Sequence, residues 1–84
     1  MTSMHVRLLA FASASDALGS GERQLDLPAQ SSVADLRREL ATRFPEIRPL
    51  LPRLAVAVDG EIANDTRTLS DGAEVALLPP VSGG

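Results

Sequence analysis

The sequence predicts a small α+β domain in which a mostly antiparallel sheet packs on one main helix. Segments with a two-residue alternation of apolar side chains lie before and after one segment with a three- and four-residue repeat. Asp-Gly and Asn-Asp pairs, which favour turns, separate the later alternating segments. A chain of 84 residues with 44% hydrophobic residues is long enough for one core and too apolar for a disordered protein.

The first two strands are expected to pair as a hairpin. Residues 4–11 alternate with a period of two, and residues 22–27 alternate again until Pro28. The faces of the first strand carry Val6, Leu8 and Ala10 on one side and Arg7, Leu9 and Phe11 on the other. The connector at 13–21 is rich in turn residues, with room for a single helical turn at 15–18.

The helix is expected to begin after Ser32 and to end before Pro45. Ser32 is a good N-cap residue, and Asp35 stands three residues later, where it can complete a capping box. The apolar stripe of this helix consists of Val33, Leu36, Leu40 and Phe44. We therefore expect this stripe, Phe44 included, to pack in the core.

The second half of the chain is expected to supply three more strands. Residues 45–53 hold three prolines and predict a short turn or an extended connector. Strands follow at 54–58, 61–63 and 74–78, separated by turns at Asp59-Gly60, Asn64-Asp65 and Asp71-Gly72. The resulting order is strand, strand, helix, strand, short strand, strand, in which the helix covers one face of the sheet.

Composition argues against several classes of function. The chain has no cysteine and one histidine, so we expect no metal site, and the acids Asp65 and Asp71 are weak candidates as ligands. A net charge of −3 argues against nucleic-acid binding, and Arg43, Arg48 and Arg53 are expected to form a solvated face. The apolar run at 8–12 is too short for a signal core or a membrane span, so a cytoplasmic protein is expected.

All eight basic side chains are arginines. Two explanations stay open for the lack of lysine. One is an arginine-rich codon composition of the genome. The other is that a protein with a reactive acyl end benefits from having no ε-amines of its own.

Apolar side chains are also expected on the sheet face away from the helix. If the first and last strands are neighbours, Leu9, Phe11 and Leu78 lie on that face, and Ile62 joins them as a candidate. Exposed apolar patches mark partner surfaces, so these four residues form the predicted partner interface. If the alternation is offset by one residue, the same side chains point inward instead.

The end of the chain carries the most specific motif. Residues 71–84, DGAEVALLPPVSGG, resemble the C-terminal signature of the small subunit of molybdopterin synthase, a ubiquitin-like sulfur carrier. The likeness extends over nearly the whole chain, through the helix opening SSVADLRREL and the first strand. It implies the ubiquitin-like β-grasp fold, with a mixed, mostly antiparallel sheet. Members of the family commonly carry an acid at the position of Ala73 and aromatic residues at Leu77 or Leu78, so the partner surface departs from their pattern.

The resemblance also implies a chemistry for the terminal carboxylate. In this family a ubiquitin-activating-type adenylyltransferase uses ATP to adenylate the terminal glycine, here Gly84 with Gly83 before it, and sulfur then replaces AMP. The resulting thiocarboxylate donates sulfur to cyclic pyranopterin monophosphate in the active site of the large subunit, which forms the molybdopterin dithiolene. The small subunit has no permanent cofactor and no independent active site, so its status as an enzyme is uncertain. A heterotetramer with the large subunit is implied.

The residues before the terminus suit insertion into a partner. The domain is expected to span 1–78 and the tail 79–84, with Pro79 and Pro80 favouring an extended path. Six such residues reach about 18 Å at roughly 3.1 Å each. Val81 and Ser82 continue the tail, and the two glycines, which lack a Cβ, can pass through a narrow channel.

Two other functions remain open at this point. One is a sulfur carrier of a related pathway, for thiamine thiazole, cysteine or tRNA thiolation, although PPVSGG favours the pterin route. It can also be a ubiquitin-like module without sulfur chemistry, an interaction domain or a modifier that forms isopeptides. A terminal Ser-Gly-Gly alone also resembles a linker, but the preceding Pro-Pro-Val argues against that interpretation.

Overall fold

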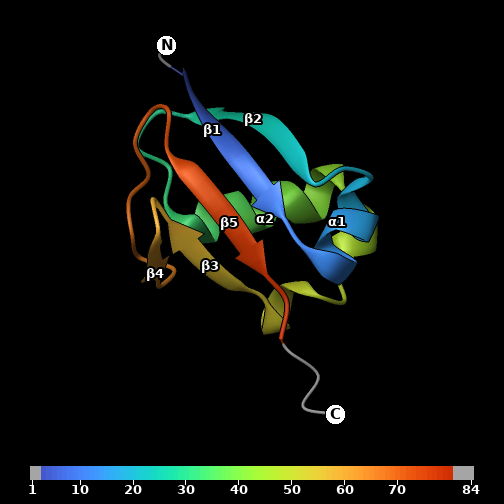
Figure 1. Cartoon of the computed structure of the whole chain (residues 1–84). Helices are drawn as coiled ribbons and strands as arrows, with labels where there is room; N and C mark the ends of the chain where they lie inside the picture. Colours follow the sequence, from blue (N-terminus) through green and yellow to red (C-terminus); the bar gives the residue numbers. More distant parts are fainter. Residues whose placement is uncertain (1–2, 81–84) are drawn as a thin grey trace.

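The computed structural model describes residues 3–80 of the chain (Figure 1). Its elements follow the predicted order, with an additional helix after the first strand and two short 3-10 helices before the third. They are β1 (Ser3–Ala10), α1 (Ala12–Leu18), β2 (Glu22–Pro28), α2 (Val33–Arg43), η1 (Pro45–Ile47), η2 (Leu51–Arg53), β3 (Ala55–Val58), β4 (Glu61–Ala63) and β5 (Glu74–Leu78).

Within the described residues the strands form one five-stranded sheet in the order β2-β1-β5-β3-β4. β1 pairs antiparallel with β2, and β5 pairs antiparallel with β3, which pairs antiparallel with β4. The central pair, β1 and β5, is parallel, so the two strands run side by side in the same direction (Figure 1). The predicted α+β class is confirmed, and so is the condition that the first and last strands are neighbours.

The core lies between the sheet and α2, which covers one face of it (Figure 1). The alternating residues predicted to face inward are buried in all four long strands. The strands contribute Val6, Leu8, Leu25, Leu27, Val56, Val58, Val75 and Leu77, and α2 contributes Val33, Leu36 and Leu40. In the part of the chain that the structure describes, every buried side-chain nitrogen or oxygen has a hydrogen-bond partner.

The start of α2 has the predicted capping box. The Asp35 backbone N–H donates to Ser32 Oγ at 3.2 Å, and the Ser32 backbone N–H donates to Asp35 Oδ2 at 2.9 Å. These hydrogen bonds, and the ion pair with Arg38, lower the pKa of the Asp35 carboxyl. At the other end of the helix, Phe44 packs against the core as expected, and the Arg23 guanidinium lies 4.9 Å from its ring centroid.

Two connectors are more ordered than their sequence indicates. The sequence predicted at most a single helical turn at 15–18. The helix α1 instead has seven residues and ends at Gly19, whose φ of 76° is easily adopted by glycine. Burial of Ala14 and Leu18 stabilises this helix, which has no side-chain N-cap. The proline-rich connector forms η1 and η2 because Ile47, fully buried, anchors it to the core.

Arg37 links α2 to two distant segments. Its Nη1 donates to the Leu51 carbonyl at 2.7 Å, its Nη2 to the Leu54 carbonyl at 2.8 Å, and its Nε to Asp65 Oδ1 at 2.9 Å. Leu54 directly precedes β3, so this guanidinium holds the start of β3 against the helix. The sequence analysis did not single out Arg37, because its partners are backbone carbonyls that no sequence pattern reveals.

We expect Arg37→Ala to lower the free energy of unfolding by about 2–3 kcal/mol, because it removes charge-assisted hydrogen bonds from partly buried carbonyls. Arg38→Ala is the matched control, since the Arg38 side chain is 76% exposed, against 23% for Arg37, and contacts only Asp35 among the ion pairs. It should change stability by less than about 0.5 kcal/mol. Urea unfolding followed by circular dichroism measures both, and equal losses would contradict the proposed role of Arg37.

Candidate functional site

A row of apolar residues crosses the sheet on the face away from α2. Leu9 pairs with Ala76, Ala76 with Ala57, and Ala57 with Ile62. Residues opposite one another in a ladder share a face, so these four side chains form a continuous line over β1, β5, β3 and β4. Their neighbours in sequence are the inward-facing core residues, which fixes this line on the outer face.

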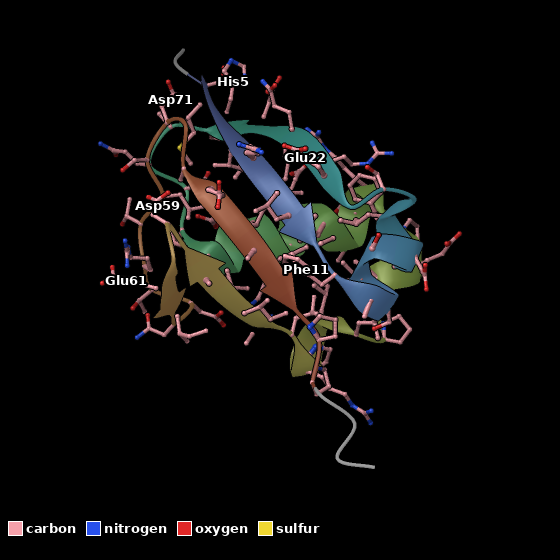
Figure 2. The ribbon with its side chains drawn as sticks, viewed as in Figure 1. His5, Phe11, Glu22, Asp59, Glu61 and Asp71 are labelled. Carbon is pink, nitrogen blue, oxygen red and sulfur yellow. The ribbon has the colours of Figure 1, made fainter. Side chains whose placement is uncertain are left out.

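A second apolar group lies beside this row at the end of β5. Leu78 pairs with Ala55 of β3. Phe11 follows Ala10, whose partner is Leu77, and so lies at the level of Leu78; Figure 2 shows it where β1 ends beside β5. The two groups together are called here the outer apolar patch, which consists of Leu9, Phe11, Ala55, Ala57, Ile62, Ala76 and Leu78.

The most exposed large apolar side chains of the described region belong to this patch. Ile62 is 70% exposed and Phe11 is 50% exposed. Leu9 and Leu78 are half-buried by their neighbours. Two exposed side chains of this size on one face of a small domain are typical of a surface that a partner covers.

The chain leaves the sheet at the edge of the outer apolar patch. β5 ends at Leu78, a patch residue, and Pro79 and Pro80 follow it, half-buried and exposed respectively. The parallel pairing of β1 and β5 places this exit at the end of the sheet opposite the start of β1 (Figure 1). The other candidate tail residues, Val81, Ser82, Gly83 and Gly84, lie outside the described residues.

Charged side chains occupy another part of the outer face. Arg7 forms ion pairs with Glu22 and with Glu74, the latter at 3.8 Å. The Glu74 backbone N–H donates to Asp59 Oδ1 at 2.9 Å, next to the tight turn at Gly60. The outer face thus becomes charged toward the start of β1, and Glu22, the ladder partner of Leu9, borders the outer apolar patch.

His5 lies in this charged part, at the end of the sheet far from Phe11 (Figure 2). Its Nδ1 hydrogen-bonds to the Asp26 carboxylate on β2, and its backbone N–H donates to Asp71 Oδ1 at 2.8 Å. The hydrogen bond to Asp26 raises the pKa of the His5 imidazole, and the negative charges of Asp26 and Asp71 raise it further.

The candidate metal ligands and the arginine face have contacts within the domain. Asp65 accepts a hydrogen bond from Arg37, and Asp71 accepts one from His5. Among residues 3–80, no three metal-binding side chains gather at one place. Arg43 pairs with Glu39, and Arg48 Nε donates to the Ala41 carbonyl at 2.9 Å, while Arg53 is exposed on η2. Neither helix in that same stretch is long and apolar enough to cross a membrane.

At the end of β5, leucines stand at the two positions where the resembled family commonly has aromatic residues, and the two leucines point to opposite faces of the sheet. Leu77 is fully buried in the core, whereas Leu78 belongs to the outer apolar patch, so the departure at Leu78 is the one that alters the outer surface. The sequence analysis missed Ala55, Ala57 and Ala76, which complete the patch. Their signal is the alternation in AVAV and EVALL, but alanine is too small to mark a face by itself.

The chain is similar to known proteins in family, in sequence and in structure. The ThiS family model matches residues 8–84 of this chain. The molybdopterin synthase sulfur carrier subunit of Caenorhabditis briggsae is 33% identical over 81 residues, which cover 94% of this chain and 96% of that protein. Among solved structures, small archaeal modifier protein 1 from Haloferax volcanii has a TM-score of 0.83 at 26% identity, covering 93% of this chain and 99% of that one.

Two further structures bear on the fold and on assembly. In a complex of subunits 1 and 2 of the molybdopterin-converting factor from Helicobacter pylori 26695, one chain matches with a TM-score of 0.68 at 27% identity, covering 96% of this chain and 100% of that one. Caldiarchaeum subterraneum ubiquitin matches with a TM-score of 0.66 at 17% identity, covering 99% and 100%, which shows the fold alone. The predicted ubiquitin-like β-grasp fold is confirmed.

The His5 pair gives a prediction that needs only the isolated domain. An NMR titration of the single imidazole should give a pKa above 6.5, and Asp26→Asn should bring it back toward 6.5. Because the pKa is raised in the folded state, the pair stabilises the fold below a pH of about 6.5 and loses this effect as the pH rises through the folded-state pKa. Asp71→Asn should lower the pKa less, and an Asp26→Asn variant with an unchanged pKa would contradict the pairing.

Proposed function

The chain belongs to the ThiS family, and on that premise we propose that it is a sulfur carrier and the small subunit of a molybdopterin synthase. The observation that carries the proposal is the position of the motif PPVSGG, which follows the last strand directly at the edge of the outer apolar patch. The 33% identity with a subunit of that name supports the choice of pathway. The proposal places the protein in the cytoplasm, where ATP for the activating enzyme is available.

The first step of the proposed cycle activates the Gly84 carboxylate. Carboxylates are poor electrophiles because resonance delocalises their charge and oxide is a very poor leaving group. A ubiquitin-activating-type adenylyltransferase overcomes this when a Gly84 oxygen attacks the α-phosphorus of ATP and pyrophosphate leaves. The product is an acyl adenylate with AMP as a good leaving group. The carrier itself needs no bound cofactor for this step.

The second step introduces sulfur and the third delivers it. A thiol reduces a donor persulfide, forming a disulfide and releasing hydrosulfide. The hydrosulfide attacks the acyl carbon, so that a C–S bond forms, the C–O bond to AMP breaks and a thiocarboxylate results. The absence of cysteine is consistent with this route, because the chain has no thiol side chain that could carry the sulfur as a persulfide. In the large subunit, the thiocarboxylate sulfur is transferred to cyclic pyranopterin monophosphate, and water restores the Gly84 carboxylate.

We assign the outer apolar patch to the contact with the large subunit. The patch lies beside Leu78, so a partner that covers it meets the tail where the tail begins. Six residues after Leu78 reach about 18 Å when extended, which is enough for Gly83 and Gly84 to enter a buried active site. The complex of subunits 1 and 2 from Helicobacter pylori, one chain of which resembles this one, supports a two-subunit assembly, and we propose a heterotetramer.

Two other functions of the same terminus remain as alternatives. The match to a small archaeal modifier protein favours a role as a modifier, in which Gly84 forms an isopeptide with a lysine of a target protein. A carrier for thiamine thiazole, cysteine or tRNA thiolation would keep the thiocarboxylate and change the acceptor. The partner that co-purifies with the chain distinguishes the pathways, and the mass of the terminus distinguishes carrier from modifier.

Removal of Gly84 should abolish sulfur loading. Incubated with activating enzyme, ATP and a sulfur donor, the intact chain should gain about 16 Da as oxygen is replaced by sulfur, and the chain without Gly84 should gain nothing. Intact-protein mass spectrometry measures the shift. The truncated chain should keep its affinity for the large subunit, since the outer apolar patch is unchanged. Sulfur transfer by the truncated chain would disprove the mechanism.

The two isoleucines of the chain provide a matched test of the patch. Ile62→Ser should weaken binding to the large subunit by about tenfold or more and change the free energy of unfolding by less than about 0.5 kcal/mol. Ile47→Ser, at a fully buried position, should cost about 2–5 kcal/mol of stability. Calorimetric titration and urea unfolding measure the two effects, and unchanged affinity of the Ile62 variant would exclude that position from the interface.

A further inference from the structure

The protein offers very few groups that can accept an acyl group. All eight basic residues are arginines, and the chain contains neither lysine nor cysteine. A lysine ammonium, with a pKa near 10.4, supplies a small fraction of nucleophilic amine at neutral pH. A guanidinium with a pKa above about 12 stays protonated and has no lone pair to attack a carbonyl. The charge of the surface is therefore provided by groups that do not react with an activated carboxylate.

The one imidazole is held away from the chain exit. His5 has its Nδ1 bonded to Asp26, and this contact raises the pKa of the ring, so a larger fraction is protonated and unreactive. In the parallel register Ala10 pairs with Leu77, which places Leu78 beside Phe11 and six residues along the sheet from His5. That separation is about 20 Å along the sheet, so the imidazole lies at the opposite end of the sheet from the residue after which the tail begins.

The hydroxyl groups of Ser31 and Ser32 are also poor acceptors. Ser31 is buried, and its Oγ donates to the Pro28 carbonyl at 2.7 Å. Ser32 Oγ lies 3.1 Å from Asp35 Oδ2, but the lowered pKa of Asp35 makes that carboxylate a weak base. A serine hydroxyl needs a stronger base at this distance to attack an acyl group at neutral pH.

We propose that the side chains of this domain are inert toward its own activated terminus, so that the acyl group at Gly84 does not pass to a side chain of the same chain or of another copy of it. The inference rests on the proposed activation of Gly84, and it holds for both a carrier and a modifier. For a carrier it means that acyl adenylate is not lost to cross-linking between copies before sulfide arrives. For a modifier it means that copies attach singly to targets and do not form side-chain-linked chains.

The excluded reaction is acyl transfer to an amine. The amine nitrogen attacks the Gly84 carbonyl carbon, a C–N bond forms, the C–O bond to AMP or the C–S bond of a thioester breaks, and the ammonium proton goes to solvent. A single introduced lysine should make this reaction possible. Arg53 suits the substitution because it is exposed on η2 and stands two residues before Ala55, the ladder partner of Leu78.

The test uses the full chain with a chemically prepared thioester at Gly84, which does not depend on any activating enzyme. The wild-type thioester, incubated at neutral pH with an excess of unactivated copies, should form no dimer linked through a side chain. Arg53→Lys should give about tenfold more covalent dimer, together with an internal amide about 18 Da lighter than the hydrolysed chain. Arg53→Gln removes the charge without adding an amine and should behave as wild type. Arg38→Lys, at an exposed site on α2, should give dimer through contact between copies.

A second arm repeats the comparison with activating enzyme and ATP but without a sulfur donor. The proposal is overturned if wild-type chain forms side-chain adducts as fast as Arg53→Lys, or if neither lysine variant exceeds wild type in side-chain adducts in the thioester arm. Peptide mapping that places the acyl group on His5 or a serine of wild-type chain would also overturn it. If the thioester arm behaves as expected but no acyl adenylate forms in the enzyme arm, the proposed function fails while the inertness of the side chains stands.

Discussion

The parallel pairing of β1 with β5 is the constraint on which the rest of this structure depends. It brings the first and last strands together at the centre of the sheet, where Val75 and Leu77 are buried against the same core as Val6 and Leu8. A parallel pair also requires that the chain crosses from one end of the sheet to the other between the strands. The strands β2 and β3 make these passes, since they run antiparallel to β1 and β5, and α2 between them covers the inner face. The direction of β5 that this pairing sets also fixes the direction in which the chain leaves the sheet.

The same pairing organises the outer face. β5 alternates strictly, so its burial of Val75 and Leu77 commits Ala76 and Leu78 to the opposite side, in register with Leu9. β3 extends the row to Ile62. Because β5 is both part of the patch and the last strand, the patch adjoins the point at which Pro79 and Pro80 leave the sheet. That continuity supports the proposal of a subunit that docks and delivers its terminus in one complex.

The charged and the apolar side chains of the outer face lie on different parts of the sheet. The pair of His5 with Asp26 lies at the start of β1, away from the exit, and the ion pairs of Arg7 lie in the middle of the strand. Exposed ion pairs of this kind contribute little to stability. The outer apolar patch is the surface proposed for association. Arginine in place of lysine preserves the charge of the surface while removing its amines, which is a chemical property independent of the fold.

Much of the fold could be predicted from the sequence, and the misses have physical causes. The bounds of β5 and the capping box at Ser32 followed from alternation and capping chemistry, which act over a few residues. The length of α1 did not, because burial of Ala14 and Leu18 against the core overrides a weak local preference. The contacts of Arg37 and the alanines of the outer apolar patch also escaped, since they depend on which segments meet in space.

By itself, the sequence determined the alternation of each strand, the caps and turns, the nucleophiles that the chain lacks and the motif at its end. These are properties of single residues and of their near neighbours. Only the tertiary structure decided that Leu9, Ala76, Ala57 and Ile62 form one row, that this row adjoins the chain exit, and that His5 lies at the opposite end of the sheet. The reason is that strand order and register arise from burial of a shared core between segments far apart in the chain.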